Sequence, residues 1–102
     1  MRTEKTGAML LVTDLPTLTS DNSRAFKDFV RKALEPGQDL VAVDLGKARS
    51  VDSNGLGALI SIQKTLSGRG GRVRLLHPSP LVNEMFQLLQ LDKIFEIVPR
   101  PS

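Results

Sequence analysis

The segment 40–45 is the part of the chain that most restricts its possible folds. It is apolar at every position until Asp44, so it lacks the alternation of a strand with one face in water. A strand of this kind is buried on both faces and belongs in the middle of a sheet. Because stretches with helical spacing precede and follow it, the sequence predicts an α/β protein in which helices connect the strands.

Short apolar runs and helical faces alternate along the rest of the chain. The alternation implies right-handed crossovers and a largely parallel or mixed sheet within one domain, residues 1–102. The residues from Pro99 to Ser102 are expected to be a frayed tail. We expect strands at 9–12, 40–45, 73–76 and 94–98, an edge strand within 1–6, and helical faces at 26–34, 56–66 and 81–89.

The last helical stretch has clear start signals and a broad apolar face. Ser79 is predicted to cap it and Pro80 to occupy its first position. Its apolar residues are expected to form a buried stripe that belongs to the hydrophobic core, and not a groove in which a partner docks. The stripe comprises Leu81, Val82, Met85, Phe86 and Leu89.

Composition removes several classes of function. The chain contains no cysteine and a single histidine, His77, which excludes disulfides, thiolate zinc sites, a cysteine nucleophile and a metal site with several histidines. The net charge of +3 comes from scattered residues, and with no Trp, no Tyr and only four Phe the chain has few of the aromatic residues on which a nucleic-acid binder stacks bases. No run is long enough to span a membrane and no signal peptide follows Met1. We therefore expect a cytoplasmic protein without metal, cofactor, nucleic-acid partner or membrane insertion.

The segment after the central strand carries the most specific chemistry. Asp52, Ser53 and Asn54 are helix-capping residue types, and Gly55 and Gly57 follow them at the start of a helix. The first turn of a helix offers free N–H groups and about half a positive charge, so a phosphate on Ser53 would be well solvated there. Two interpretations stay open on these residues alone. The segment is either a site that another protein approaches and modifies, or a plain N-cap whose glycines permit tight helix–sheet packing.

The same segment resembles the signature of the STAS domain, the fold of bacterial anti-sigma factor antagonists. The resemblance covers most of the chain in the expected order, and it implies a mixed sheet of four to five strands with helices packed mainly on one face. The signature itself is matched by Asp52-Ser53-Asn54-Gly55-Leu56-Gly57. Further matches are Val43-Asp44-Leu45 before it, and Gly70-Gly71-Arg72-Val73, Pro78-Ser79-Pro80-Leu81-Val82 and Leu91-Asp92-Lys93-Ile94-Phe95 after it.

In that family, the unphosphorylated protein binds an anti-sigma factor that is also a serine kinase, and a sigma factor is released. The kinase phosphorylates the first serine of the signature, which weakens binding, and a metal-dependent phosphatase of the PP2C type reverses the change. The resemblance implies that Ser53 is the phosphorylation site, that the protein is no enzyme, and that it is a monomer or a weak dimer. The implied partner-binding residues are Thr19, Ser20, Asp21, Asn22, Asp52, Asn54, Gly55, Leu56 and Gly57.

One position departs from the family pattern. The family has Leu-Asp-x-x-Asn before the first helix, whereas this chain keeps Leu18 and Asn22 but has Thr19 at the Asp position. Either Thr19 preserves a hydrogen bond without the charge, or the phosphorylation switch is retuned or absent. The second possibility favours an alternative function, a STAS subunit of a lipid-transport ABC complex that docks without a phosphorylation cycle.

Two further constellations carry weaker interpretations. Ser53, His77 and an Asp do not indicate a hydrolase, because the Gly-x-Ser-x-Gly elbow of that class is missing. Lys47 and Arg49, in the loop before Ser53, either contact an acidic partner or are solvated surface charges.

Overall fold

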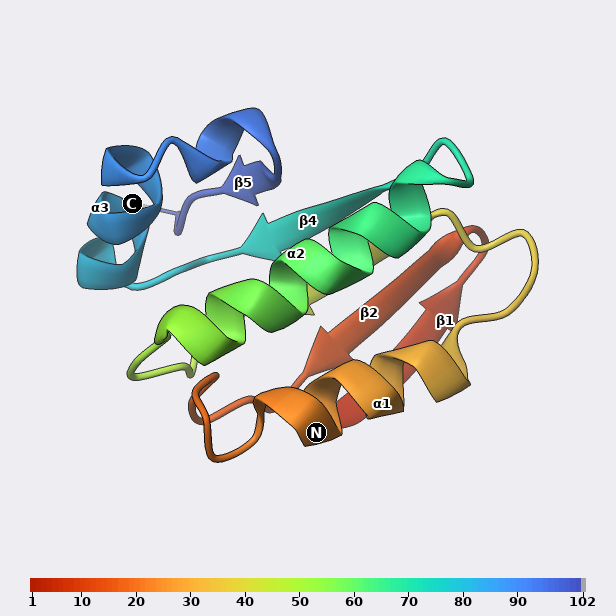
Figure 1. Ribbon diagram of the computed structural model, residues 1–102, viewed down its shortest axis with the longest axis horizontal. Helices are drawn as coiled ribbons and strands as arrows, with labels where there is room; N and C mark the ends of the chain where they lie inside the picture. The colour runs from red at the N-terminus through yellow and green to blue at the C-terminus, as the bar shows by residue number, and fades with distance from the viewer. Residues whose placement is uncertain (102) are drawn as a thin grey trace.

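A computed structural model shows five strands and three α-helices over residues 1–101, with Ser102 outside the described residues (Figure 1). The strands lie in the sheet in chain order, β1-β2-β3-β4-β5. β1 is antiparallel to β2, and β2 to β5 are parallel to one another. The strands are β1 (Arg2–Thr6), β2 (Met9–Thr13), β3 (Leu40–Asp44), β4 (Arg72–Leu76) and β5 (Glu96–Val98); the helices are α1 (Ser23–Ala33), α2 (Ser53–Ser67), α3 (Pro80–Leu88) and the short 3-10 helix η1 (Leu91–Lys93).

This architecture confirms the predicted α/β fold with a mixed sheet and helices mainly on one face. Each parallel crossover moves one strand further in the same direction, and right-handed crossovers of this kind place their helices on one side of the sheet. Figure 1 shows α1 and α2 lying side by side in front of the strands. Side chains of all three helices join one hydrophobic core, among them Phe26, Leu59 and Phe86.

The double burial predicted for the central strand is confirmed. Val41, Ala42 and Val43 of β3 are fully buried, and their neighbours in the sheet belong to parallel strands on both sides. Leu10 of β2 and Val73 of β4 flank Val41 in register, so an apolar row crosses the sheet beneath the helices. β3 ends at Asp44, and the loop leading to α2 begins there.

The C-terminal part of the sequence corrects two expectations. The predicted strand 94–98 is shorter, because the amides of Ile94 and Phe95 donate to the Leu91 carbonyl and hold a turn there. The predicted buried stripe of α3 is narrower: Val82 and Phe86 are buried and Met85 is partly buried, whereas Leu81 and Leu89 are exposed. α3 lies at the end of the helix layer and packs along one narrow face, because no further α-helix within residues 1–101 covers its outer side (Figure 1).

The chain end is attached to the loops at the carboxyl ends of the strands. The Arg100 guanidinium donates to the carbonyl oxygens of His77 and Gly46, at 3.1 and 2.8 Å. These bonds hold part of the tail that was expected to fray.

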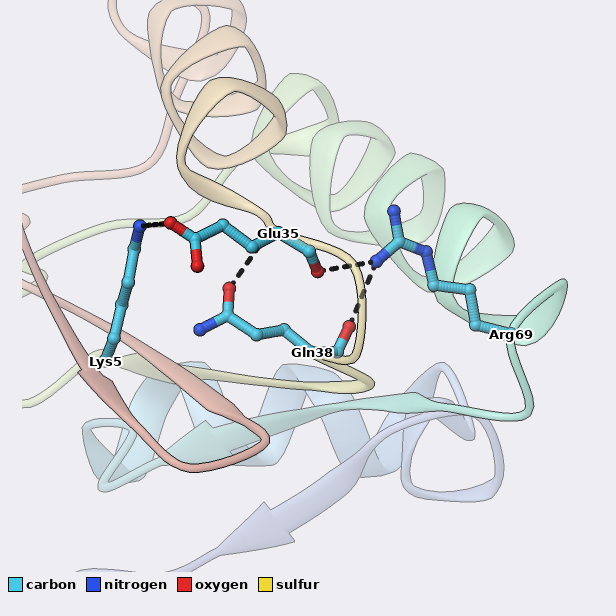
Figure 2. Close-up of polar contacts among 4 residues, drawn as sticks. All are labelled: Lys5, Glu35, Gln38 and Arg69. Atoms are coloured by element: carbon cyan, nitrogen blue, oxygen red, sulfur yellow. Dashed lines mark hydrogen bonds and ion pairs between the residues drawn. The ribbon is translucent and has the colours of Figure 1, made fainter.

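The opposite edge of the sheet, at the amino ends of the parallel strands, is closed by a small polar cluster (Figure 2). Arg69 Nη1 donates to the carbonyl oxygens of Glu35 and Gln38, at 3.1 and 3.2 Å, and so joins the end of α2 to the loop before β3. The same loop approaches Gly71 so closely that an added Cβ would lie 1.9 Å from the Asp39 carbonyl oxygen. Only a residue without a side chain fits at this position.

We predict that Gly71→Ala destabilises the protein by about 1–3 kcal/mol, as overpacking does, because the Asp39 backbone must move away. Gly68→Ala is the matched control. Its Cβ would meet only the Thr65 carbonyl oxygen, at an ordinary 3.5 Å, so its stability should be unchanged or slightly higher. Urea denaturation of both variants measures the difference, and equal midpoints would contradict the close approach.

Candidate functional site

The candidate site lies where the loop after β3 turns into α2. Asp52 is the N-cap, and its Oδ1 accepts a hydrogen bond from the Gly55 amide at 3.0 Å. Ser53 is therefore the first residue of the helix, and it is exposed. Its hydroxyl group stands at the positive end of a helix of 15 residues.

A second loop, the one between β2 and α1, is joined to this helix start. Leu18 forms an isolated parallel bridge with Val51, in which the Leu18 amide donates to the Ser50 carbonyl at 3.0 Å and the Asp52 amide donates to the Leu18 carbonyl at 3.2 Å. The Thr17 hydroxyl adds contacts to the Ser50 carbonyl and hydroxyl oxygens, at 3.2 and 3.0 Å. The two loops thus form one structural unit, which we call the paired loops (residues 16–22 and 49–52).

Asp52 links the paired loops to the helix through both of its carboxylate oxygens. While Oδ1 caps α2, Oδ2 accepts a hydrogen bond from the Ser20 amide at 3.0 Å. The pKa of Asp52 lies below its ordinary value of 3.8, chiefly because the Gly55 amide stabilises the carboxylate. Burial opposes this shift, and the Ser20 amide and Asn54 add to it. A negative charge is therefore fixed beside Ser53 at neutral pH.

The two glycines of the signature have different structural roles. A Cβ at Gly55 would lie 2.0 Å from the Leu18 carbonyl oxygen, so this buried glycine lets the loop pack against the helix. A Cβ at Gly57 would meet nothing within 4 Å, and Gly57 is exposed. The tight-packing interpretation therefore accounts for Gly55, while Gly57 leaves an open position on the surface next to Ser53.

Thr19 takes part in a local hydrogen-bonded turn that leads into α1. Its hydroxyl accepts a hydrogen bond from the Asp21 amide at 3.3 Å, and its own amide donates to the Asn22 side-chain oxygen at 3.0 Å. The Asn22 side chain in turn donates to the Thr17 carbonyl at 2.7 Å. Thr19 thus makes a hydrogen bond to the backbone without adding a charge to this surface.

The structure brings the sequence-predicted site residues together at one end of α2. The residues around Ser53 differ in their exposure to solvent, and therefore in how far a partner could reach them. Ser20, Asp21, Asn54 and Gly57 are exposed; Thr19, Asn22, Asp52 and Leu56 are partly buried; Gly55 is buried.

Sequence reasoning missed Thr17 and Ser50, the hydroxyl pair that fastens the paired loops. No local pattern marks them, because their contact joins residues 33 positions apart. Together with Lys47 and Arg49 they line a surface hollow of about 950 Å³ beside the paired loops. Lys47 lies 4.0 Å from the exposed Asp14 carboxylate, a separation at which an exposed ion pair contributes little to stability.

The residues from 1 to 101 also limit the chemistry of the site. Within this range, no cluster of three or more His, Cys, Asp or Glu side chains could hold a metal ion. In the same range, none of the helices combines the length and the apolar character that crossing a membrane would require.

Comparisons with known proteins agree with this geometry. Residues 3–99 match the family described as "Mlab, STAS domain". A candidate anti-sigma factor antagonist of Thermotoga maritima is 32% identical over 81 residues, which cover 78% of this chain and 72% of that protein. A homologous protein from Thermotoga neapolitana is 31% identical to this chain, also over 81 residues.

Solved structures show the same fold. The crystal structure of TM1081, a candidate anti-sigma factor antagonist of Thermotoga maritima, superposes with a TM-score of 0.89 at 25% identity, over 97% of this chain and 86% of that one. The anti-sigma factor antagonist SpoIIAA in its unphosphorylated form has a TM-score of 0.80 at 20% identity, over 97% of this chain and 88% of its own, and supports the fold alone. With the family match over nearly the whole described chain, the protein belongs to the STAS domain family, among relatives that include anti-sigma factor antagonists.

Proposed function

We propose that this protein is an anti-sigma factor antagonist that works by partner switching, with Ser53 as the phosphorylated residue. In the unphosphorylated state it binds an anti-sigma factor that is also a serine kinase, and a sigma factor is released. The observation that carries the proposal is the exposed Ser53 hydroxyl on the first turn of α2, beside a carboxylate that holds the neighbouring loop. Such partners would place the protein in the bacterial cytoplasm.

The position of Ser53 suits reversible modification. Its side chain is exposed, so a kinase or a PP2C-type phosphatase could reach it without unfolding the helix. The free N–H groups and the dipole of the first turn stabilise a phosphate there. The exposed Gly57 leaves room for the approach of another protein's backbone or active site. The chain supplies the substrate serine and a docking surface, and the catalytic groups come from its partners.

The effect of phosphorylation follows from the charge already present. A phosphate adds about −1.5 to −2 charges at Ser53, directly beside the Asp52 carboxylate. The helix N-terminus partly offsets this charge, so the fold of the sheet and α2 is retained. The phosphate competes with Asp52 for the nearby amides, and the bond from Ser20 is the one that joins two separate elements. Phosphorylation therefore both charges the docking surface and loosens the loop that carries Thr19 to Asn22.

A second function remains a candidate because of Thr19. A docking subunit of a lipid-transport ABC complex needs the same surface but no phosphorylation cycle. The uncharged Thr19 hydroxyl, at the position where the resembled family has an Asp, favours this candidate. Stable co-purification with transporter subunits, together with no phosphate turnover on Ser53, would select it over partner switching.

We predict that incubation with the cognate serine kinase and ATP places phosphate on Ser53 and on no other residue, as detected by mass spectrometry. Ser53→Asp should weaken binding of that kinase by about 30- to 150-fold, equivalent to about 2–3 kcal/mol, and Ser53→Ala should retain binding. Ser67→Asp is the matched control, since it adds the same charge to an exposed serine at the other end of α2, roughly 20 Å along the helix. Titration calorimetry that gave equal affinities for Ser53→Asp and Ser53→Ala would rule out the switch.

We also predict a pH dependence that depends on Asp52. Because the folded-state pKa is lowered, the carboxylate stabilises the fold above its ordinary value of 3.8, and this contribution is lost as the pH falls through the lowered pKa. Asp52→Asn should therefore lower the urea midpoint at about pH 6 and reduce the difference between about pH 6 and about pH 2.5. Asp21→Asn, an exposed carboxylate of the same loop, is the control and should leave that difference unchanged. A wild-type pH profile for Asp52→Asn would refute the role of the carboxylate.

A further inference from the structure

An apolar surface on the outer side of α3 takes no part in the site around Ser53. Leu81 and Leu88 are 74% and 77% exposed, Leu89 at the end of the helix is 55% exposed, and Ile94 just after η1 is 43% exposed. Among residues 1–101, only Met1 is another large hydrophobic residue with comparable exposure. We call Leu81, Met85, Leu88 and Leu89 the α3 patch.

α3 has two apolar faces. One is buried in the core, and the α3 patch is the other. Val82 and Phe86 are buried in the core, while Leu81, Met85 and Leu88 follow one another at spacings of four and three on the outer side. Met85 packs partly against the core, whereas Leu81 and Leu88 lie outside it. Contiguous exposed apolar residues of this kind mark a surface that another molecule covers.

The patch surrounds a shallow hollow of about 380 Å³ whose one charged lining residue is Glu84. Glu84 is exposed and lies midway along the apolar row, three residues after Leu81 and four before Leu88. No Lys or Arg lines the hollow. A molecule that covers the α3 patch must therefore present apolar groups to the leucines and a group that tolerates contact with the Glu84 carboxylate.

The charge of Glu84 distinguishes between the possible occupants. In a two-fold dimer through this face, whether the helices run parallel or antiparallel, Glu84 of one copy would lie near Glu84 of the other, because the residue is at the centre of the row. A lipid surface with anionic headgroups would repel the carboxylate and would find no cation on the row to hold it. Both a second copy and an anionic membrane are thus disfavoured by the same group.

We propose that the α3 patch docks an amphipathic helix of a different protein, which carries a Lys or Arg within its apolar face. The apolar residues of that helix cover Leu81 and Leu88, and its cation pairs with Glu84 in a partly dehydrated setting. This is the helix-in-groove mode of recognition. The α3 patch shares no residue with the surface around Ser53, so this binding does not depend on the phosphorylation state.

The test uses two synthetic helical peptides, each with Leu at successive helical positions of one face, that differ only in an Arg or a Glu at the centre of that face. The full chain should bind the Arg peptide about fivefold more tightly than the Glu peptide, with amide shifts in α3 seen by NMR. Glu84→Lys should reverse this preference. The double variant Leu81→Ser and Leu88→Ser should weaken binding by at least about tenfold, and its urea midpoint should stay that of the wild type because both side chains are exposed.

Two controls separate this surface from the rest of the molecule. Gln87→Ser changes an exposed residue of α3 that does not line the hollow, and it should leave peptide binding unchanged. Ser53→Asp should also leave it unchanged, so failure here and failure of the proposed partner switch are distinguishable.

Several results would overturn the proposal. They are equal affinities for the two peptides, no shift in α3, or no effect of Glu84→Lys on the preference. Sedimentation that shows a dimer abolished by Leu88→Ser would assign the patch to a second copy. Pelleting with vesicles of mixed zwitterionic and anionic phospholipid, abolished by the same variant, would assign it to a membrane.

Discussion

The contact between the Leu18 backbone and the start of α2 determines the arrangement of the functional end of the molecule. The Leu18 carbonyl lies where a side chain at position 55 would be, so only glycine allows the loop and the helix to meet. Once they meet, the Leu18 carbonyl accepts the Asp52 amide, and Asp52 is placed to hold both Gly55 and Ser20. Because Asp52 serves as the N-cap, its side chain points toward the helix start and the neighbouring loop. Ser53, the next residue, is left exposed.

At each of the two edges of the sheet, a glycine lets a loop carbonyl pack closely against the chain, but the polar groups that hold the loop differ. At the amino edge, Gly71 meets the Asp39 carbonyl, and the Arg69 guanidinium joins the neighbouring loop to α2 through carbonyl oxygens. At the carboxyl edge, Gly55 meets the Leu18 carbonyl. There the loop is held by the Asp52 carboxylate, which accepts hydrogen bonds from backbone amides. A phosphate on Ser53 lies at the carboxyl edge, where it competes with Asp52 for the same amides, and the length of α2 separates it from Arg69. Sensitivity to an added phosphate is therefore confined to one edge.

The sequence predicted those features that depend on neighbouring residues. The unbroken apolar run of β3, the cap before α2 and the Ser79–Pro80 start of α3 are all local patterns, and the structure has each of them. The bond from Ser20 to Asp52 and the contact of Thr17 with Ser50 were not foreseen, since they join residues 32 and 33 positions apart. Helical spacing shows that α3 has apolar residues on its surface, but it does not tell how many of them a neighbouring element covers. The exposure of Leu81 was missed for that reason.

A surface that is negative before modification can still work as a switch, provided that the existing charge is already engaged. The Asp52 carboxylate accepts hydrogen bonds from the Gly55 and Ser20 amides. In the partner switch that we propose, the partner of the unphosphorylated protein therefore meets a neutral serine beside a charge that is hydrogen-bonded within the protein. A phosphate on Ser53 has no such internal partners reserved for it, apart from the free amides of the helix start. These amides offset only part of the added charge, so the phosphate must also be hydrated or take amides from Asp52, and both requirements oppose a dry interface. The rest of α2 packs against the core through Leu59, Ile62 and Leu66, which lie beyond the first turn, so we expect the proposed phosphate to leave the fold of the helix unchanged.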